Sequence, residues 1–205
     1  YLPERILTNK EMESIVDTTD EWITSRTGIR ERRIAADDEA TSDLSYKAAL
    51  KAIEDAGIDK DEIELVIVAT TTPDYSMPST AAIVQDKIGI RKAAAFDMEA
   101  ACTGCGYALT TGYSFIKAGI YKKVLVIGAD VFSRILDWED RGTCILFGDG
   151  AGAAVLGEVE TGGYLGGDLQ ADGAGAQELI VPSSGSRKAF REEVLTSRDQ
   201  FVKMN

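Results

Sequence analysis

Three short apolar runs, separated by helix-like segments, most constrain how this chain can fold. They span residues 65–70, 93–98 and 124–129 and are rich in aliphatic side chains. Continuous apolar runs of this length are typical of strands that are buried on both faces of a sheet. The segments between them predict helices at 80–88 and 103–118. Because right-handed strand–helix–strand crossovers make successive strands parallel, the sequence predicts an α/β fold around a parallel sheet.

Three further helices are predicted before the first apolar run. A capping-box pattern at 8–11 predicts a short helix that reaches about Val16. A helical turn is expected at 19–23. The clearest helix spans 42–56, where apolar residues share one face, and Gly57 follows as its C-cap.

The sequence after the third apolar run predicts two more short strands and then irregular structure. The strands are expected at 144–147 and 151–156, and the glycine-rich stretch 148–150 between them predicts a hairpin turn. Glycine is frequent from 157 to 185, where we expect irregular structure with room for one added strand. The run 148–152 also resembles a truncated dinucleotide-binding fingerprint, but that motif needs a helix after it and a strand is expected here.

The composition limits the classes of function. The chain has 205 residues, 44% of them hydrophobic, which is enough for one large domain or two small ones. Its net charge of −12 argues against nucleic acid or an anionic membrane as a partner, and no apolar run approaches the ~20 residues of a membrane span. Three cysteines suggest a reducing compartment, so a cytoplasmic location is expected. The lack of histidine removes the commonest metal ligand, so no metal site is expected.

Cys102 is the strongest candidate for a reactive group. It follows the predicted strand 93–98 and precedes the predicted helix 103–118, where unpaired N–H groups and the helix dipole stabilise an anion. A thiolate at that position would be a nucleophile. A buried and inert thiol is the alternative. With Cys105 it also forms a C-x-x-C pattern that would allow thiol–disulfide chemistry, although the flanking residues do not match thioredoxin-like motifs.

Two residues one helical turn apart are candidates for a flat cationic surface. Trp22 and Arg26 have this spacing, and such a pair suits an adenine ring or a phosphate. The alternative is an ordinary exposed pair that binds nothing. Arg141 has the same two interpretations. The residues alone leave these alternatives open.

Five motifs stand in one order along the chain: 20–23, 26–32, 100–102, 140–143 and 147–156. Together they resemble the β-ketoacyl-acyl-carrier-protein synthase III family, the initiating condensing enzymes of type II fatty-acid synthesis. The resemblance covers nearly the whole chain and is weakest from Gly157 to Arg198. It implies a thiolase-like fold of two similar βαβαβ halves and a homodimer. Residues 1–205 would form the first half, with a mixed sheet, and we expect the second half to be absent because the chain has no initiator methionine and ends without a turn signal.

The resemblance implies an acyl transfer at Cys102. The thiol would take an acyl group from acyl-CoA, and malonyl on acyl carrier protein would lose CO2 and attack that thioester. The products would be a β-ketoacyl-acyl carrier protein, CoA and CO2, with no cofactor. A backbone N–H near Cys102 would stabilise the oxyanion. By family match, Thr18, Trp22, Arg26 and Arg141 would bind CoA, and Met77, Phe132, Phe147 and Leu179 would line the acyl pocket.

Within that set, Trp22 and Arg141 would sandwich the adenine, and Met77 would reach the acyl pocket of the partner subunit. Two features depart from the family pattern. The family completes its site with a histidine and an asparagine from the second half, and this chain has no histidine, so we expect acylation without condensation. Cys105 stands where the family often has an apolar residue, and a disulfide with Cys102 would silence the enzyme. Full activity after peroxide treatment without reductant would contradict that hypothesis.

Three alternative functions stay open. A related CoA-dependent enzyme, such as a hydroxymethylglutaryl-CoA synthase or a polyketide-type acyltransferase, would share the fold and the nucleophile. A protein that uses Cys102 and Cys105 for thiol–disulfide exchange belongs to another class. A non-catalytic half-domain that assembles with another chain is the third. Transfer of an acyl group to Cys102 would separate the enzymes from the other two.

Overall fold

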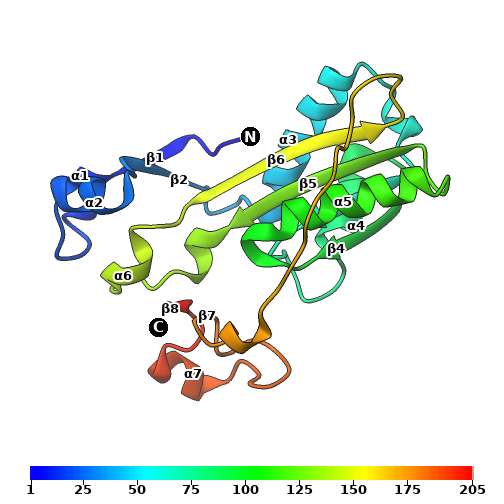
Figure 1. The fold of residues 1–205 in the computed structure, drawn as a ribbon. Coiled ribbons are helices and arrows are strands. Elements are labelled where there is room, and N and C mark those ends of the chain that lie inside the picture. The colour runs from blue at the N-terminus through cyan, green and yellow to red at the C-terminus, as the bar shows by residue number, and fades with distance from the viewer. Residues whose placement is uncertain (205) are drawn as a thin grey trace. The chain divides into compact units, whose positions relative to one another are not determined.

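The computed structural model describes residues 1–204, and the chain folds into two compact units (Figure 1). Unit 1 consists of residues 1–3, 35–131 and 150–169, and unit 2 consists of residues 4–34, 132–149 and 170–204. Unit 1 carries a four-stranded sheet, whereas unit 2 carries two small two-stranded sheets. Each unit therefore combines segments that are far apart in the sequence.

The sheet of unit 1 has the strand order β4-β3-β5-β6. Its strands are β3 (Leu65–Ala69), β4 (Ala94–Met98), β5 (Lys123–Val131) and β6 (Asp149–Gly157). β3 pairs in parallel with both neighbours, so that Ile67 stands opposite Phe96 on one side and Val126 on the other. β6 runs antiparallel to β5 (Figure 1). The predicted parallel strands and the predicted mixed sheet are both confirmed.

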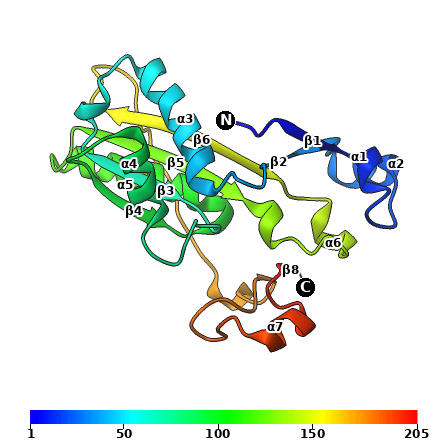
Figure 2. The same cartoon turned by 180° about the vertical axis from the view of Figure 1, so that it is seen from behind.

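Helices cover both faces of this sheet (Figures 1 and 2). The helices are α3 (Thr41–Ala56), α4 (Thr80–Ile88) and α5 (Gly104–Lys117). α3 and α4 lie on one face and α5 lies on the other. β3 contacts both layers because its side chains alternate between the faces. Val66 and Val68 pack with α3 and α4, whereas Ile67 packs with Ala108 of α5.

Helix α5 lies close to the sheet because its buried face carries almost no side chains. Its buried residues are Gly104, Ala108 and Gly112, which are spaced by four and share one face. A Cβ atom on Gly112 would lie 2.8 Å from Leu156 Cδ1, and one on Gly104 would lie 3.2 Å from Ala69 Cβ. These approaches fix the helix against the sheet, and with it the turn that precedes the helix.

Unit 2 is built around a smaller apolar cluster. Its buried members are Leu7, Met12, Ile23, Ile34, Cys144 and Ile145. Its helices and strands are β1 (Arg5–Thr8), α1 (Asn9–Met12), α2 (Asp20–Thr27), β2 (Glu31–Ile34), α6 (Arg141–Cys144), β7 (Leu179–Ile180), α7 (Glu192–Ser197) and β8 (Lys203–Met204). β1 pairs with β2 and β7 with β8, both antiparallel. Short 3-10 helices in the chain are η1 (Lys60–Glu62), η2 (Ala101–Thr103), η3 (Phe132–Ile135) and η4 (Gly173–Gly175).

The strand predicted at 144–147 is wrong. Its first residue ends helix α6, and a turn follows. Asp140 explains the difference, because its carboxylate accepts hydrogen bonds from Gly142 N at 2.9 Å and from Thr143 Oγ1 at 2.7 Å. Such a cap starts a helix from local contacts, which here outweigh the apolar pattern that follows.

The hairpin turn predicted at 148–150 is also wrong, because β6 has already begun within it. Gly148 serves a close approach and not a turn. A Cβ atom there would lie 3.0 Å from Arg33 O and 3.0 Å from Arg32 Cβ. Glycine therefore lets this segment pass directly over β2. The strand predicted at 151–156 is confirmed within β6.

The other elements lie close to their predicted positions. α3, α4 and α5 begin and end within one residue of the prediction, and Gly57 and Gly89 follow α3 and α4 with φ values of +62° and +82°. The capping box before α1 is present, but α1 ends at Met12 and does not reach Val16. α2 continues to Thr27, beyond the single turn expected. β7 is the strand added in the glycine-rich segment.

Replacing Gly112 with leucine is expected to lower the free energy of unfolding by about 1–3 kcal/mol, because the new side chain must fit between α5 and the sheet. Leucine favours helices, so the loss would come from packing. The matched control is Gly106→Leu, where a Cβ atom would meet nothing within 4 Å. The control should be at least as stable as the unaltered chain in urea unfolding followed by circular dichroism. Equal stability of the two variants would contradict the close packing of α5.

Candidate active site

Cys102 lies in the short turn that joins the sheet to helix α5. Strand β4 ends at Met98, and η2 carries the cysteine before α5 begins at Gly104. The thiol is exposed, so the interpretation of Cys102 as a buried and inert residue is wrong. α5 begins one residue later than predicted, which places Cys102 in the 3-10 turn that leads into the helix.

The backbone of this turn has an uncommon conformation. Ala101 has a φ of +44°, in the left-handed region that residues with a Cβ atom rarely adopt. Thr103 donates two hydrogen bonds to Ala100 O, from its N at 3.2 Å and from its Oγ1 at 2.8 Å. Ala101 N donates to Glu99 Oε1 at 3.2 Å. Strain of this kind persists only where the surroundings impose it, and it is common at functional sites.

Cys105 is also exposed, and its side chain rests against strand β5. Its Cβ and Sγ lie 3.3 Å and 3.6 Å from the place that a Cβ atom would take on Gly128. Gly128 therefore leaves the space that Cys105 occupies. A disulfide between Cys105 and Cys102 stays a prediction.

Two aspartates that no sequence motif marks, Asp97 and Asp130, fix the loops at the carboxyl ends of the strands. Asp130 Oδ1 accepts hydrogen bonds from backbone and hydroxyl groups of residues 70–72 at 2.8 to 3.2 Å. Asp97 accepts from Thr80 N and Ala81 N, both at 2.7 Å, and so caps helix α4. The sequence signal that could have identified both residues is an aspartate near the end of an otherwise apolar strand. These contacts anchor both ends of the loop between β3 and α4.

The residues predicted to line an acyl pocket belong to both units. Met77 lies in unit 1, in the loop before α4, and is 83% exposed. In unit 2, Phe132 and Phe147 stack with their ring centroids 4.4 Å apart. Leu179 lies on β7 of unit 2 and is 41% exposed. The structure therefore brings Phe132 and Phe147 directly together.

A buried pair of polar residues holds the two stacked rings. Asp149 Oδ1 accepts a hydrogen bond from Ser133 N at 2.8 Å, and Asp149 Oδ2 accepts one from Ser133 Oγ at 2.6 Å. Ser133 follows Phe132 in the chain, and Asp149 lies two residues after Phe147. The carboxylate therefore fixes the two segments that carry the rings.

Helix α2 has clear local signals at both of its ends. Thr19 Oγ1 accepts a hydrogen bond from Trp22 N at 3.1 Å, which caps the first turn. Gly28 follows the helix with a φ of +74°, which glycine adopts without strain. Trp22 and Arg26 are thereby placed one turn apart on a short, fixed helix.

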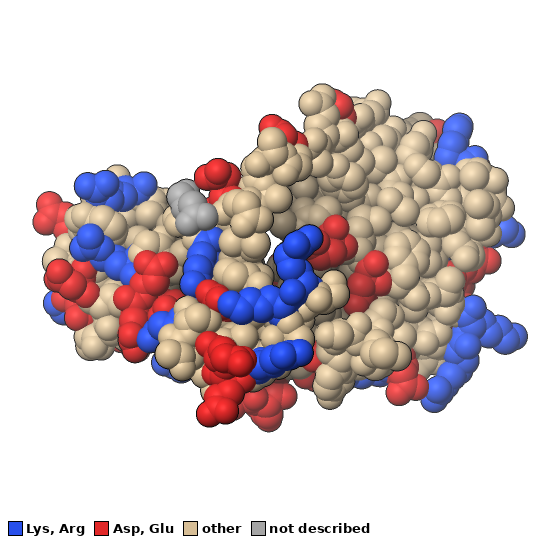
Figure 3. Space-filling model, turned by 90° about the horizontal axis from the view of Figure 1, so that it is seen from below, with Lys and Arg blue, Asp and Glu red and all other residues tan. Residues whose placement is uncertain are grey.

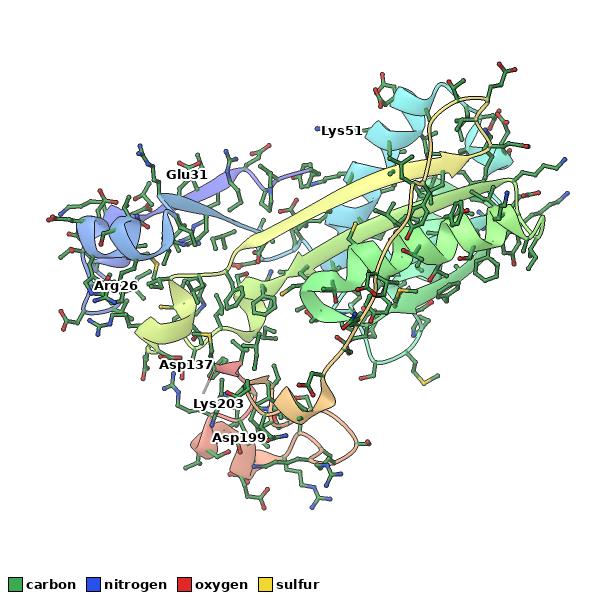
Figure 4. The ribbon with its side chains drawn as sticks, in the orientation of Figure 1. Arg26, Glu31, Lys51, Asp137, Asp199 and Lys203 are labelled. Atoms are coloured by element: carbon green, nitrogen blue, oxygen red, sulfur yellow. The ribbon has the colours of Figure 1, made fainter. Side chains whose placement is uncertain are left out.

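The predicted cationic surface around Trp22 is present in unit 2. The guanidinium carbon of Arg26 lies 4.8 Å, and that of Arg141 4.7 Å, from the centroid of the Trp22 ring. Figure 4 labels Arg26 among the side chains of this region. Arg141 Nη1 donates a hydrogen bond to Asp17 O at 2.9 Å. Thr18 Oγ1 is buried and has no hydrogen-bond partner among residues 1–204, so it has an unused capacity to bind a polar group.

Cys144 differs from the other two cysteines. Its side chain is buried in the apolar cluster of unit 2. Burial raises the pKa of its thiol to about 11, with Asp140 acting in the same direction and Arg32 opposing it. The thiolate is therefore disfavoured at Cys144 near neutral pH.

Three further features concern metal ligands, membrane-spanning helices and surface charge. Among residues 1–204, no three His, Cys, Asp or Glu side chains are grouped so as to hold a metal ion. Within the same described part of the chain, no helix has both the length and the apolar character to cross a bilayer. Acidic and basic side chains lie intermingled on the face shown in Figure 3.

The chain matches one protein family. The profile of the family described as 3-oxoacyl-[acyl-carrier-protein (ACP)] synthase III matches residues 96–177. The β-ketoacyl-[acyl-carrier-protein] synthase III of Desulfitobacterium hafniense is 53% identical over 205 residues, which cover 100% of this chain and 62% of that protein. The chain thus spans less than two thirds of the length of the curated relatives it matches.

Solved structures agree with this match. The β-ketoacyl-[acyl carrier protein] synthase III of Thermus thermophilus is 44% identical with a TM-score of 0.88, covering 100% of this chain and 63% of that one. The 3-oxoacyl-(acyl carrier protein) synthase III of Pseudomonas aeruginosa is 40% identical with a TM-score of 0.88, covering 100% and 62%. These similarities confirm the predicted thiolase-like fold.

Treatment of the folded chain with iodoacetamide at about pH 8 is expected to modify Cys102 and Cys105 and to leave Cys144 unmodified. The first two side chains are exposed, whereas Cys144 is buried and its raised pKa disfavours the reactive thiolate. Peptide mapping by mass spectrometry gives the modified fraction at each cysteine. The same reaction in urea is the control and should modify all three. Equal labelling of Cys144 in the folded chain would contradict the structure of unit 2.

Proposed function

We propose, on the premise that this chain belongs to the 3-oxoacyl-[acyl-carrier-protein] synthase III family, that its Cys102 thiol accepts an acyl group from acyl-CoA. The observation that carries the proposal is the exposed thiol on the strained turn between β4 and α5. The Cys102 thiolate attacks the thioester carbonyl and a new carbon–sulfur bond forms. The CoA thiolate leaves and takes up the proton that Cys102 has lost.

The full enzyme would then use this acyl group in a condensation. Malonyl on acyl carrier protein loses CO2, and the resulting carbanion attacks the acyl thioester on Cys102. The products of the complete cycle are a β-ketoacyl-acyl carrier protein, CoA and CO2. Residues 1–205 contain no histidine, so the histidine that the family resemblance implies for this step is not among them. We expect these residues alone to carry out acylation and not condensation.

The nucleotide end of CoA is assigned to the surface around Trp22. An indole ring with two guanidinium groups within 5 Å offers both stacking and positive charge to an adenine that carries phosphates. Thr18, four residues before Trp22 in the chain, is assigned to the same end of CoA, and its buried hydroxyl has no hydrogen-bond partner among residues 1–204. Arg141 rests on the Trp22 ring, so it must move aside before an adenine can stack between them.

We assign the acyl chain to a pocket lined by Met77, Phe132, Phe147 and Leu179. We also propose that the enzyme is a homodimer and that it acts in the cytoplasm. The stacked rings of Phe132 and Phe147 provide an apolar surface for the chain. Met77 stands almost fully exposed, which suits a side chain that is covered by a partner subunit. An acyl group buried against such residues gains stability from the hydrophobic effect.

A second candidate function is thiol–disulfide exchange between Cys102 and Cys105. Both side chains are exposed, which such chemistry requires. A stable disulfide in the purified chain, together with no acyl transfer from any acyl-CoA, would favour this function over acyl transfer.

Incubation with acetyl-CoA is expected to place one acetyl group on the Cys102 peptide. Intact and peptide-mapped mass spectra measure the adduct. Cys102→Ala should abolish it because no other sulfur occupies the turn, whereas Cys105→Ser is the matched control and should keep it. An acetylated Cys102→Ala chain, or no adduct on the unaltered one, would contradict the acyl-transfer proposal.

Replacing Trp22 with leucine should weaken the binding of CoA by about tenfold or more, because the stacking platform for the adenine is lost. Isothermal titration calorimetry measures the affinity. The control is acetylation of Cys102 by S-acetyl-N-acetylcysteamine, a thioester without a nucleotide, whose rate should not change in the Trp22→Leu variant. An unchanged affinity for CoA would place the nucleotide elsewhere.

A further inference from the structure

Arg32 is a buried cation whose hydrogen-bond partners are neutral groups. It is only 5% exposed, on strand β2 of unit 2. Its Nη1 and Nη2 both donate to Asn9 Oδ1 at 3.0 Å, and Nη2 also donates to Ile145 O at 2.8 Å. Burial lowers the pKa of this guanidinium, and its Nε has no partner among residues 1–204. A charge buried in this way costs stability, so its presence calls for a further role.

Asn9 connects this cation to helix α2. The residue is 1% exposed, and it lies at the start of α1. Its Nδ2 donates to Asp20 Oδ1 at 2.8 Å and to Thr24 Oγ1 at 3.2 Å. Asp20 and Thr24 belong to α2 and lie on either side of Trp22 in the sequence. The amide of Asn9 therefore lies between an acidic group on α2 and the buried guanidinium of Arg32.

The guanidinium of Arg32 also contacts the chain that follows helix α6. Ile145, whose carbonyl accepts the hydrogen bond from Arg32, directly follows helix α6, and α6 begins at Arg141. Further along, Gly148 passes so close to β2 that a Cβ atom on it would lie 3.0 Å from Arg32 Cβ. Arg32 thus contacts the chain beyond the helix that presents Arg141.

We propose that Asn9 and Arg32, here called the Asn9–Arg32 bridge, are positioning residues that fix the chain after α6 and so hold the guanidinium of Arg141 opposite the Trp22 ring, with or without an adenine between them. Through that placement they set the affinity for the adenine end of CoA, a conclusion that rests on the proposed function. Neither side chain needs to touch the ligand, since both are buried. Without the bridge, α6 and α2 keep their apolar contacts, but the guanidinium of Arg141 loses its fixed place above the indole.

The hydrogen bonds of the bridge have direction, which apolar packing lacks. The apolar cluster of unit 2 already includes Ile23 of α2, together with Cys144 and Ile145. Apolar contacts hold these elements together without specifying their register, because they have no direction. The bridge adds six hydrogen bonds of 2.7 to 3.2 Å. Asn9 Nδ2 donates to Asp20, Thr24 and Ile29 O, and Arg32 donates twice to Asn9 and once to Ile145 O. Such networks define one arrangement out of several that the core would allow.

The first test follows the Arg141 side chain directly by nuclear magnetic resonance. Stacking on an indole shifts the Nε–H signal of Arg141 through the ring current, and the signal is assigned by its loss in Arg141→Lys. In Arg32→Met, which keeps much of the volume and removes the donors, the signal should move to the position of an unstacked arginine. The matched control is Lys10→Gln, next to Asn9, whose side chain is 82% exposed and whose signal pattern should be unchanged.

The second test distinguishes a loss of CoA binding from a general loss of structure. Arg32→Met should weaken the binding of CoA by about tenfold and leave acetylation of Cys102 by S-acetyl-N-acetylcysteamine unchanged. Lys10→Gln should change neither. If Arg32→Met does not fold, Arg32→Lys, which keeps the charge and fewer hydrogen bonds, should show an intermediate shift and an intermediate affinity. Circular dichroism establishes the fold of each variant.

The outcomes decide different parts of the proposal. A folded Arg32→Met or Arg32→Lys variant whose Arg141 signal stays stacked overturns the positioning role. A moved signal with an unchanged affinity for CoA overturns the link to ligand binding. If the unaltered chain binds no CoA, the proposed function fails, and the Arg141 signal still decides the positioning role independently.

Discussion

The close approach of helix α5 to the sheet is the contact around which unit 1 is arranged. Its strip of Gly104, Ala108 and Gly112 lets the helix backbone come near β3 and β5, where any larger side chain would force a gap. β3 is buried along its whole length between this helix and the α3–α4 layer. The turn that presents Cys102 is short and strained, and it keeps its conformation because both the strand before it and the helix after it are fixed.

Carboxylates and one guanidinium hold the loops in place, whereas apolar packing holds the sheet. Asp130 and Asp97 hold the loop between β3 and α4, and Asp149 holds the segments of the stacked phenylalanines. Arg32 with Asn9 joins α2 to the end of α6. In each case a charged side chain satisfies polar groups that helices and strands leave unpaired. Met77, Phe132 and Phe147 stand on the segments that these carboxylates fix.

Local signals account for the part of the fold that could be predicted from the sequence. Continuous apolar runs identified β3, β4 and β5, and capping residues with terminal glycines identified the limits of α3 and α4. The spacing of Trp22 and Arg26 indicated that they share one helix face, and the apolar run before Cys102 placed it at the junction of a strand and a helix. The reactivity of Cys102 stays a prediction. The apolar run at 144–147 wrongly predicted a strand, because the cap at Asp140 starts helix α6 just before it. Contacts between distant segments, such as Arg141 on Trp22, leave no trace in a single sequence beyond the family resemblance.

The parallel pairing of β3 has a consequence for how the chain reaches its fold. Leu65 pairs with Ala94 on one side and with Val124 on the other, so whole helices separate strands that are neighbours in the sheet. Closing such long loops loses entropy before any pairing forms, and chains rich in these contacts fold slowly. Until both neighbours arrive, β3 is an uncovered apolar segment that can pair with other chains. Productive folding therefore competes with self-association, and the yield of refolding should fall as the protein concentration rises.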